Sequence, residues 1–274
     1  FTGSTFEANR AEHSGGSVYL VGNFQTTVDD CQFLRNRAEE GGAVLVQGPE
    51  TQEGRQISQY AELNILSSTF DGNGARLGGA ISLQPGMNGN ITSSRFANNA
   101  ATDGGAVYLL NDASLAVDDV SFVRNSAERG GAVYLEAESA PSTEISNSSS
   151  PRVRFEMRSS ECHRNQASLG GCIAAFNNTH IRIQVSEIEG NVASSDGGGV
   201  YGFRMNDLTV ESSTLRGNRA AQGGAVCVRS PPFGDNPSPV SISRSIVNIS
   251  DCDISSNTAG TGGGFWGEDV VSLW

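Results

Sequence analysis

The sequence predicts an all-β protein that folds as a single-stranded parallel β-helix, a solenoid of about nine coils. The pattern F-x-x-N-x-A, a short polar spacer and G-G-A-V recurs in phase along the chain, as between Phe122 and Leu135. Apolar residues alternate within each unit, which is typical of strands and not of helices. The units repeat every 26 or 27 residues wherever nothing is inserted. A fixed period of this length indicates a repeat architecture.

The strand before each corner is centred on the residue three positions before an anchoring asparagine. This residue is phenylalanine in the first five units, and the later units have other apolar side chains or a cysteine. Stacked in successive coils about 4.8 Å apart, these residues would form a core column in a rod roughly 43 Å long. They are Phe6, Phe33, Phe70, Phe96, Phe122, Cys162, Ile188, Leu215 and Ile254.

Each asparagine is followed two positions later by alanine and five or six positions later by a pair of glycines. Asparagine tolerates left-handed backbone at a corner and can bond to its equivalent in the next coil, whereas a glycine pair allows a corner that other residues could not form. We therefore expect one asparagine column along the rod. Its members are Asn9, Asn36, Asn73, Asn99, Asn125, Asn165, Asn191, Asn218 and Asn257.

Two further strands complete each coil, one after the glycine pair and one about eight residues before the next asparagine. Both positions are apolar, as at Val107 and Val117 in the fourth and fifth units. Each coil of 26–27 residues therefore has three short strands, separated by polar or glycine-containing corners.

Three insertions lengthen the regular spacing, near residues 47–56, 136–151 and 230–239. All three follow the strand after the glycine pair and recur every third coil, so their roots would lie about 14 Å apart on one edge. Insertions of this kind either carry recognition or reflect drift at a tolerant corner. We expect residues 1–274 to form one β-helix domain, itself a segment of a longer protein, because a solenoid normally has capping units.

The paired F-x-x-N and G-G-A-[ILV] motifs resemble the passenger region of the chlamydial polymorphic membrane proteins, over nearly the whole chain. The resemblance implies a β-helical cell-surface adhesin or autotransporter passenger. The chain departs from that family because it contains no secretion signal and no C-terminal barrel domain. All 18 of its basic residues are arginine.

Charge excludes some partners. A net charge of −12 and an isoelectric point near 4.7 argue against binding to nucleic acid or to an anionic membrane. No apolar run approaches the roughly 18 residues that a membrane span requires.

Five cysteines in a chain of this length do not predict a disulfide framework. We expect buried free thiols that behave as small hydrophobes, with a single Cys162–Cys172 bridge as the alternative.

Four N-x-S/T sequons are candidate glycosylation sites on a secreted eukaryotic protein: Asn90, Asn147, Asn177 and Asn248. In a bacterial protein they would simply be polar surface.

An outward-facing column after the glycine corner is rich in aromatic residues. We call Tyr19, Tyr108, Tyr134, Tyr201 and Trp266 the aromatic stripe. Exposed rings in a row could stack on sugars or contact a protein partner, whereas a structural role would be cross-strand pairing or coverage by a folded-back loop. If the rings are exposed, Tyr108→Ala would cost little stability, whereas Phe96→Ala would open a cavity in the core column.

The sequence predicts no catalytic, cofactor-binding or metal-binding residues. The acidic pairs Asp29-Asp30 and Asp118-Asp119 fall three coils apart, which is too far for two carboxylates to share a proton. His13, His163 and His180 fall in different coils and at different positions, which argues against a zinc cluster.

These features predict an extracellular or cell-surface structural or adhesive protein that needs no cofactor. It would present loops, glycans and the aromatic stripe to other surface proteins or glycans, or self-associate in a filament or surface assembly. The alternative is a polysaccharide-binding or polysaccharide-degrading β-helix, a lyase or hydrolase, with activity that depends on Asp118 and Asp119.

Overall fold

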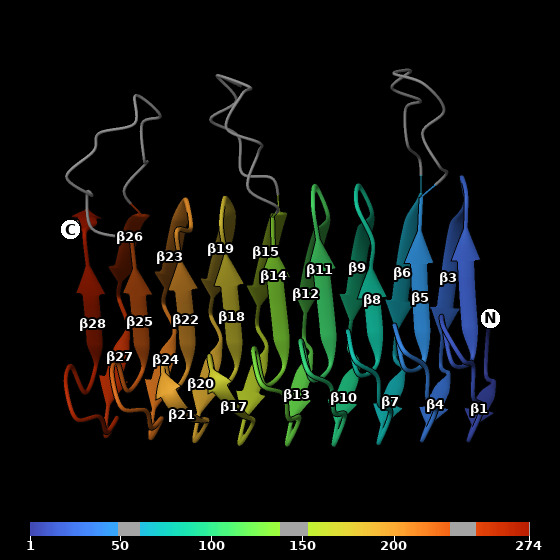
Figure 1. The fold of residues 1–274 in the computed structure, drawn as a ribbon, viewed down its shortest axis with the longest axis horizontal. Helices are drawn as coiled ribbons and strands as arrows, with labels where there is room; N and C mark the ends of the chain where they lie inside the picture. Colours follow the sequence, from blue (N-terminus) through green and yellow to red (C-terminus); the bar gives the residue numbers. More distant parts are fainter. Residues whose placement is uncertain (49–60, 138–152, 231–244, 274) are drawn as a thin grey trace.

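The computed structural model describes residues 1–48, 61–137, 153–230 and 245–273. All regular structure in these residues is β-strand, and the strands wind into a straight rod with the two chain ends at opposite ends (Figure 1). Each strand pairs in parallel with its equivalents in the neighbouring coils, and three nine-stranded sheets run along the rod. The predicted parallel β-helix is confirmed.

The first sheet contains the strand before each asparagine: β1 (Thr5–Glu7), β4 (Gln32–Leu34), β7 (Thr69–Asp71), β10 (Arg95–Ala97), β13 (Ser121–Val123), β16 (Glu161–His163), β20 (Glu187–Glu189), β24 (Thr214–Arg216) and β27 (Asp253–Ser255). The second sheet contains the strand after each glycine pair: β2 (Val18–Val21), β5 (Val44–Gln47), β8 (Ile81–Leu83), β11 (Val107–Leu110), β14 (Val133–Glu136), β18 (Ile173–Phe176), β22 (Val200–Phe203), β25 (Val226–Arg229) and β28 (Phe265–Glu268).

The third sheet leads into the next coil: β3 (Gln25–Asp29), β6 (Glu62–Leu66), β9 (Asn88–Thr92), β12 (Ser114–Asp118), β15 (Val153–Arg158), β19 (Thr179–Gln184), β23 (Asp207–Glu211), β26 (Ser245–Ser250) and β29 (Val270–Leu273). A short pair, β17 (Gln166–Leu169) and β21 (Val192–Asp196), lies at the asparagine corner of coils six and seven.

The core column of phenylalanines is formed as predicted. Cα partners in the first sheet join Phe6 to Phe33 and continue in register to Phe122. The five rings stack face to face with centroids 4.6–5.2 Å apart. The vertical register of the coils therefore stacks identical side chains directly above one another.

The asparagine column is a hydrogen-bonded ladder in which each side chain from Asn36 to Asn218 connects three coils. Asn99 Oδ1 accepts from both the backbone N–H and the Nδ2 of Asn73 in the preceding coil. Asn99 Nδ2 donates to the carbonyl oxygen of Phe70 and to Asn125 Oδ1 in the following coil, each at 3.0 Å. These amides are almost completely buried, and buried polar groups are stable only when they are paired.

One detail of the corner prediction is wrong, because the ladder asparagines themselves do not have left-handed backbone. The residue before each of them does, for example Asn98 with φ 54° and Arg124 with φ 55°. This turn points the following asparagine side chain inward, where it can reach its equivalents.

The glycine pair is required by space as well as by backbone conformation. Gly104 has φ 65°, and a Cβ atom there would lie 2.1 Å from the carbonyl oxygen of Val107. A Cβ atom on Gly105 would lie 2.1 Å from the carbonyl oxygen of Gly131 in the next coil. The chain therefore doubles back against its own following strand at this corner.

Cys162 and Cys172 form a disulfide with a Cα–Cα distance of 6.2 Å, so the expectation of free thiols is wrong for this pair. Cys162 follows Phe122 in the core column, and Cys172 takes the place that Ala132 has in coil five. The bridge fills the space that a phenylalanine fills in the earlier coils. Cys31, Cys227 and Cys252 are free.

The predicted insertions join β5 to β6, β14 to β15 and β25 to β26, so each connects the second sheet to the third. Apart from residues 47–48, 136–137 and 230, the ranges 47–56, 136–151 and 230–239 lie outside the described residues.

The ladder predicts a stability loss that depends on one side chain. Asn99→Ala should lower the free energy of unfolding by about 3 kcal/mol. The substitution leaves buried groups such as the Asn73 N–H without a hydrogen-bond partner, and each such group costs about 1–3 kcal/mol. Denaturant unfolding followed by circular dichroism measures the change. Asn88→Ala, on the exposed side of β9, is the matched control and should change stability by no more than about 0.5 kcal/mol. Equal effects of the two substitutions would contradict the ladder's role.

Candidate interaction surfaces

The aromatic stripe faces outward from the second sheet but is buried over most of its length. Tyr108, Tyr134 and Tyr201 are 4%, 0% and 6% exposed, so the predicted exposure of these three rings is wrong. Together with Leu77, Ala174 and Cys227 they form a second hydrophobic cluster, separate from the interior of the coil. The structure supports both structural alternatives, because Tyr108 and Tyr134 stack across neighbouring strands with ring centroids 5.5 Å apart, and the segment before the glycine pair folds back over the column.

The segment before each glycine pair supplies the cover. Leu77 and the partly buried Leu169 pack into the cluster from this segment. The Arg129 guanidinium lies 4.8 Å from the centre of the Tyr134 ring and makes two hydrogen bonds, of 2.6 and 2.7 Å, to the buried carboxylate of Asp103. Because the corner doubles back at its glycines, it covers the outer face of the sheet and turns the tyrosine column into a second core.

Burial changes the acidity of these phenols. Burial, assisted by the negative charge of Glu136, raises the pKa of Tyr134 and of Tyr108 far above the ordinary value. Burial also raises the pKa of Tyr201, to about 12, and that of the neighbouring Cys227 thiol to about 11. Folding therefore favours the neutral, protonated form of these phenols.

The two ends of the stripe remain accessible. Tyr19 is 49% exposed, and its hydroxyl donates a 2.7 Å hydrogen bond to Gln47. Trp266 is half-buried beneath Arg229, whose guanidinium lies 4.9 Å from the ring centre. These two rings are the members of the stripe that a partner can reach.

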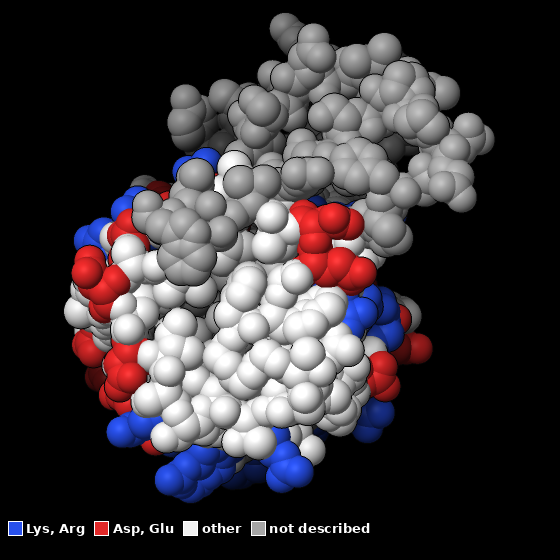
Figure 2. All heavy atoms as spheres, turned by 90° about the vertical axis from the view of Figure 1, so that its left-hand side faces the viewer, with Lys and Arg blue, Asp and Glu red and all other residues white. Residues whose placement is uncertain are grey.

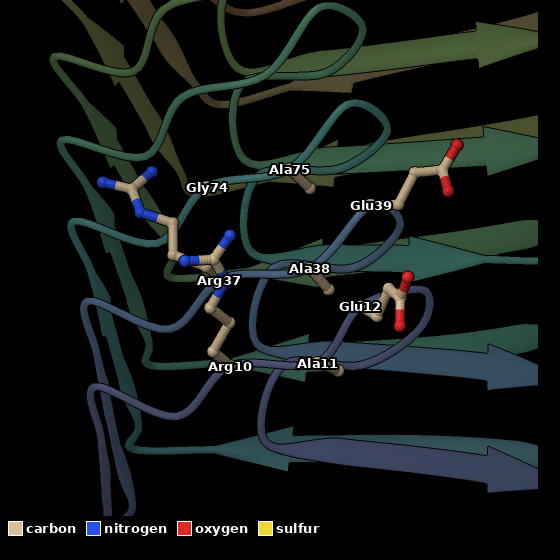
Figure 3. A pocket seen from close by; sticks show the side chains of 8 residues that line it. All are labelled: Arg10, Ala11, Glu12, Arg37, Ala38, Glu39, Gly74 and Ala75. Atoms are coloured by element: carbon tan, nitrogen blue, oxygen red, sulfur yellow. The ribbon is translucent and has the colours of Figure 1, made fainter.

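A trough of about 940 Å³ runs over the asparagine corners of coils one to three. Its floor is formed by Ala11, Ala38 and Ala75, with Arg10 and Arg37 on one side and Glu12 and Glu39 on the other (Figure 3). Neither arginine has an ion-pair partner among the described residues. The trough is therefore polar and charged at its walls and apolar at its floor.

Two shallow hollows lie on the outer face of the third sheet and share Asn90 and Ala116. Together they extend from Gln25 in β3 to Gln184 in β19. The small side chain of Ala116 leaves the depression between the longer side chains of Asn90 and Glu156, its partners in the neighbouring strands. This face offers amides, carboxylates and arginines to a ligand, and none of its lining residues is aromatic.

The candidate glycosylation sites differ in accessibility. Asn90 is exposed on β9, where its Nδ2 donates to Glu62 and Asn64 at 2.9 and 3.1 Å. Asn248 on β26 and Asn177 in the turn before β19 are half-buried. Asn147 lies outside the described residues. A glycan on Asn90 would stand in the middle of the third-sheet depression.

The acidic pairs that the sequence suggested for catalysis stay apart. Asp29 and Asp118 occupy equivalent places in β3 and β12, which are three strands apart in the third sheet. Asp30 and Asp119 follow them at exposed corners with left-handed backbone. Asp251 and Asp253 belong to coil nine. The rod thus holds these carboxylates in separate coils.

Sequence reasoning missed two groups that the coil register brings together. His180 Nδ1 lies 2.6 Å from an oxygen of Asp207, its cross-strand partner in the next coil. His163 lies beside Glu187 and Glu189, and one potential ligand atom from each residue falls within 4.8 Å of the others. The signal that could have found them is a comparison between units, because residues about 26 or 27 positions apart become neighbours in this fold.

Charged side chains lie along the left, lower and right edges of the rod in the end-on view, and arginines gather along the lower edge (Figure 2). No apolar helix of membrane-spanning length occurs among the described residues. Searches against protein-family models, curated proteins and solved structures find no match for this chain.

The second core changes the expected cost of tyrosine substitutions. Tyr134→Ala should lower the free energy of unfolding by about 3–5 kcal/mol, as large-to-small changes in a core do, and Tyr108→Ala should also be costly. Tyr19→Ala in the same column is the matched control and should change stability by no more than about 1 kcal/mol, because that ring is half exposed. Equilibrium denaturation of both variants tests the difference, and equal small effects would contradict a second core.

The raised phenol pKa values predict loss of stability at alkaline pH. An unfolded tyrosine ionises near pH 10, whereas folded Tyr201 has a pKa of about 12, so the stabilisation is complete below pH 10 and is lost as pH rises toward 12. Tyrosinate absorbance and circular dichroism recorded together should show part of the ionisation occurring with unfolding. Tyr201→Phe should make unfolding less steep with pH in this range. Full ionisation of a folded chain near pH 10 would contradict the prediction.

Proposed function

We propose that this chain is an extracellular or cell-surface structural or adhesive rod that offers its outer surfaces to a partner. The observation that carries the proposal is the unbroken register of nine coils. Buried asparagine and phenylalanine columns fill the interior, so chemistry with a partner is left to the outside of the cylinder. An adhesin or sheath component needs this combination of a stiff support and a variable exterior.

The Cys162–Cys172 disulfide supports the proposed location. Disulfides persist in oxidising compartments, including the cell exterior, the secretory pathway and the bacterial periplasm, and are rare in the cytosol. A net charge of −12 also disfavours nucleic-acid partners and suits an exposed protein that must remain dispersed. These properties agree with the resemblance to the passenger region of polymorphic membrane proteins.

The surfaces that support partner binding are the accessible ends of the aromatic stripe, at Tyr19 and Trp266, and the charged trough over coils one to three. The three insertions leave one corner of the rod and are the candidates for variable recognition. Glycans on Asn90 and Asn248 would add to this exterior. Lateral or coaxial association with further copies is part of the same proposal.

A second candidate function is binding or cleavage of a polysaccharide along the third sheet. The hollows that share Asn90 and Ala116 favour it, because Glu62, Asp118 and Glu156 line them. The separation of the acidic pairs argues for binding over catalysis. Depolymerisation of an acidic glycan that is lost in Asp118→Asn/Asp119→Asn would establish the enzyme, whereas inactivity on a broad polysaccharide panel would argue against it.

Location and redox state test the first proposal together. Antibodies against the chain should label intact, unpermeabilised cells of the source organism or detect the chain in the medium. Peptide mapping after alkylation in situ should recover Cys162 linked to Cys172. A chain confined to the cytosolic fraction with both thiols alkylated would overturn the proposal.

A further inference from the structure

The first sheet carries a cluster of metal-ligating side chains on its outer face in coils six to eight. In the strand register, His163 of β16 pairs with Glu189 of β20, and Glu189 pairs with Arg216 of β24. Glu187 lies two residues before Glu189 and faces the same side. Three potential ligands and one arginine thus meet on adjacent strands whose positions the rod fixes.

The histidine is the feature that distinguishes this cluster from ordinary surface carboxylates. His163 Nε2 is buried and makes no hydrogen bond within the described residues. It lies 3.8 Å from the nearer carboxylate oxygen of Glu187, and potential ligand atoms of all three side chains lie within 4.8 Å of one another. A buried nitrogen without a partner costs free energy, and a bound cation would satisfy it.

In this structure Arg216 forms ion pairs with both carboxylates, those of Glu187 and Glu189. Its Nη2 lies 3.0 Å from Glu189 and 3.6 Å from Glu187, and its hydrogen bond lowers the pKa of Glu189. Because one guanidinium faces two carboxylates, the cluster keeps a net negative charge. Glu161, the cross-strand partner of Glu187, adds a further carboxylate on the same sheet.

We propose that His163, Glu187 and Glu189 bind a divalent transition-metal ion such as Zn²⁺. One imidazole and two carboxylates suit this class of metal, whereas Ca²⁺ prefers oxygen ligands alone. Zinc–ligand bonds of about 2.0–2.2 Å place tetrahedral ligands roughly 3.4 Å apart, and side-chain torsions can close the remaining gap. The ion would displace Arg216 from the carboxylates and leave a coordination position open to solvent or to a partner's side chain.

The site would also join coil six to coil seven. His163 directly follows Cys162 of the disulfide, so the bridge restrains the strand that carries the imidazole. Rigid support of this kind favours metal binding because the ligands lose little freedom. The inference is independent of the proposed surface function, since a rod inside or outside the cell could carry this site.

Zinc titration of the purified, metal-stripped chain tests the inference by calorimetry, with Co²⁺ absorbance as a second readout. The chain should bind one Zn²⁺, and thermal unfolding should shift upward with added Zn²⁺. His163→Ala should weaken binding at least about tenfold, because even outer-shell partners of a metal site contribute about 10–100-fold. Glu187→Gln and Glu189→Gln should also weaken it.

Two further variants make the result decisive. Arg216→Gln should bind Zn²⁺ more tightly than the unaltered chain, because it removes the cation that competes for the same oxygens. His180→Ala is the matched control, because His180 is also a partly buried histidine beside a carboxylate but lies on the third sheet. Absence of Zn²⁺ binding, equal affinity of His163→Ala and His180→Ala, or no gain in Arg216→Gln would each overturn the site. Circular dichroism confirms that each variant is folded before it is titrated.

Discussion

The asparagine ladder is the constraint on which the rest of this rod depends. Each buried amide bonds to the coil before it and to the coil after it, so no coil can shift along or across the axis without leaving polar groups unpaired. The ladder holds the corners in register whatever the spacing along the chain, since it continues from Asn36 to Asn73 across 37 residues and from Asn125 to Asn165 across 40. Extra residues are accommodated between the second and third sheets, which is where all three insertions occur. A parallel ladder of serines, such as Ser160 Oγ accepting from the Val120 N–H, restrains the corner before the first sheet.

Vertical register also determines what the outer surface can be. A side chain that faces outward has its equivalents about 4.8 Å above and below it, so large apolar side chains in one column bury one another. In the second sheet this effect and the folded-back glycine corner produce a second core around Tyr134. Where columns contain charged residues, neighbouring coils form ion pairs, as Arg129 does with Asp103. The accessible surface therefore consists of short patches, at places where the type of side chain in a column changes from one coil to the next, and not of continuous stripes.

The periodic part of this structure could be predicted from the sequence, because nine copies in phase leave few alternatives for the strands, the phenylalanine column and the asparagine column. The same reasoning placed the tyrosines on the outer face correctly but could not show that the corner folds over them. That burial depends on how the segment before the glycines packs on the second sheet, where Leu77 and Arg129 lie against the tyrosine column. For a related reason the sequence offered the Cys162–Cys172 bridge only as the alternative to free thiols, and it did not indicate that His163 lies beside Glu187 and Glu189. Both contacts depend on which residues of neighbouring coils become adjacent in space, and a pattern along the chain does not show this.

Two departures from the repeat occur in coils six and seven, and they bear on where function is to be sought. There the phenylalanine column gives way to Cys162 and its disulfide, and the isolated bridges that join the asparagine corners of the other coils lengthen into the short strands β17 and β21. A sequence usually breaks its own regularity where something other than stability is selected. Cys162 takes the place of a phenylalanine in the core column, and the same strand carries His163 on its outer face beside the carboxylates of Glu187 and Glu189 in the next coil. Chemistry specific to this chain is therefore best sought at the coils that depart from the repeat.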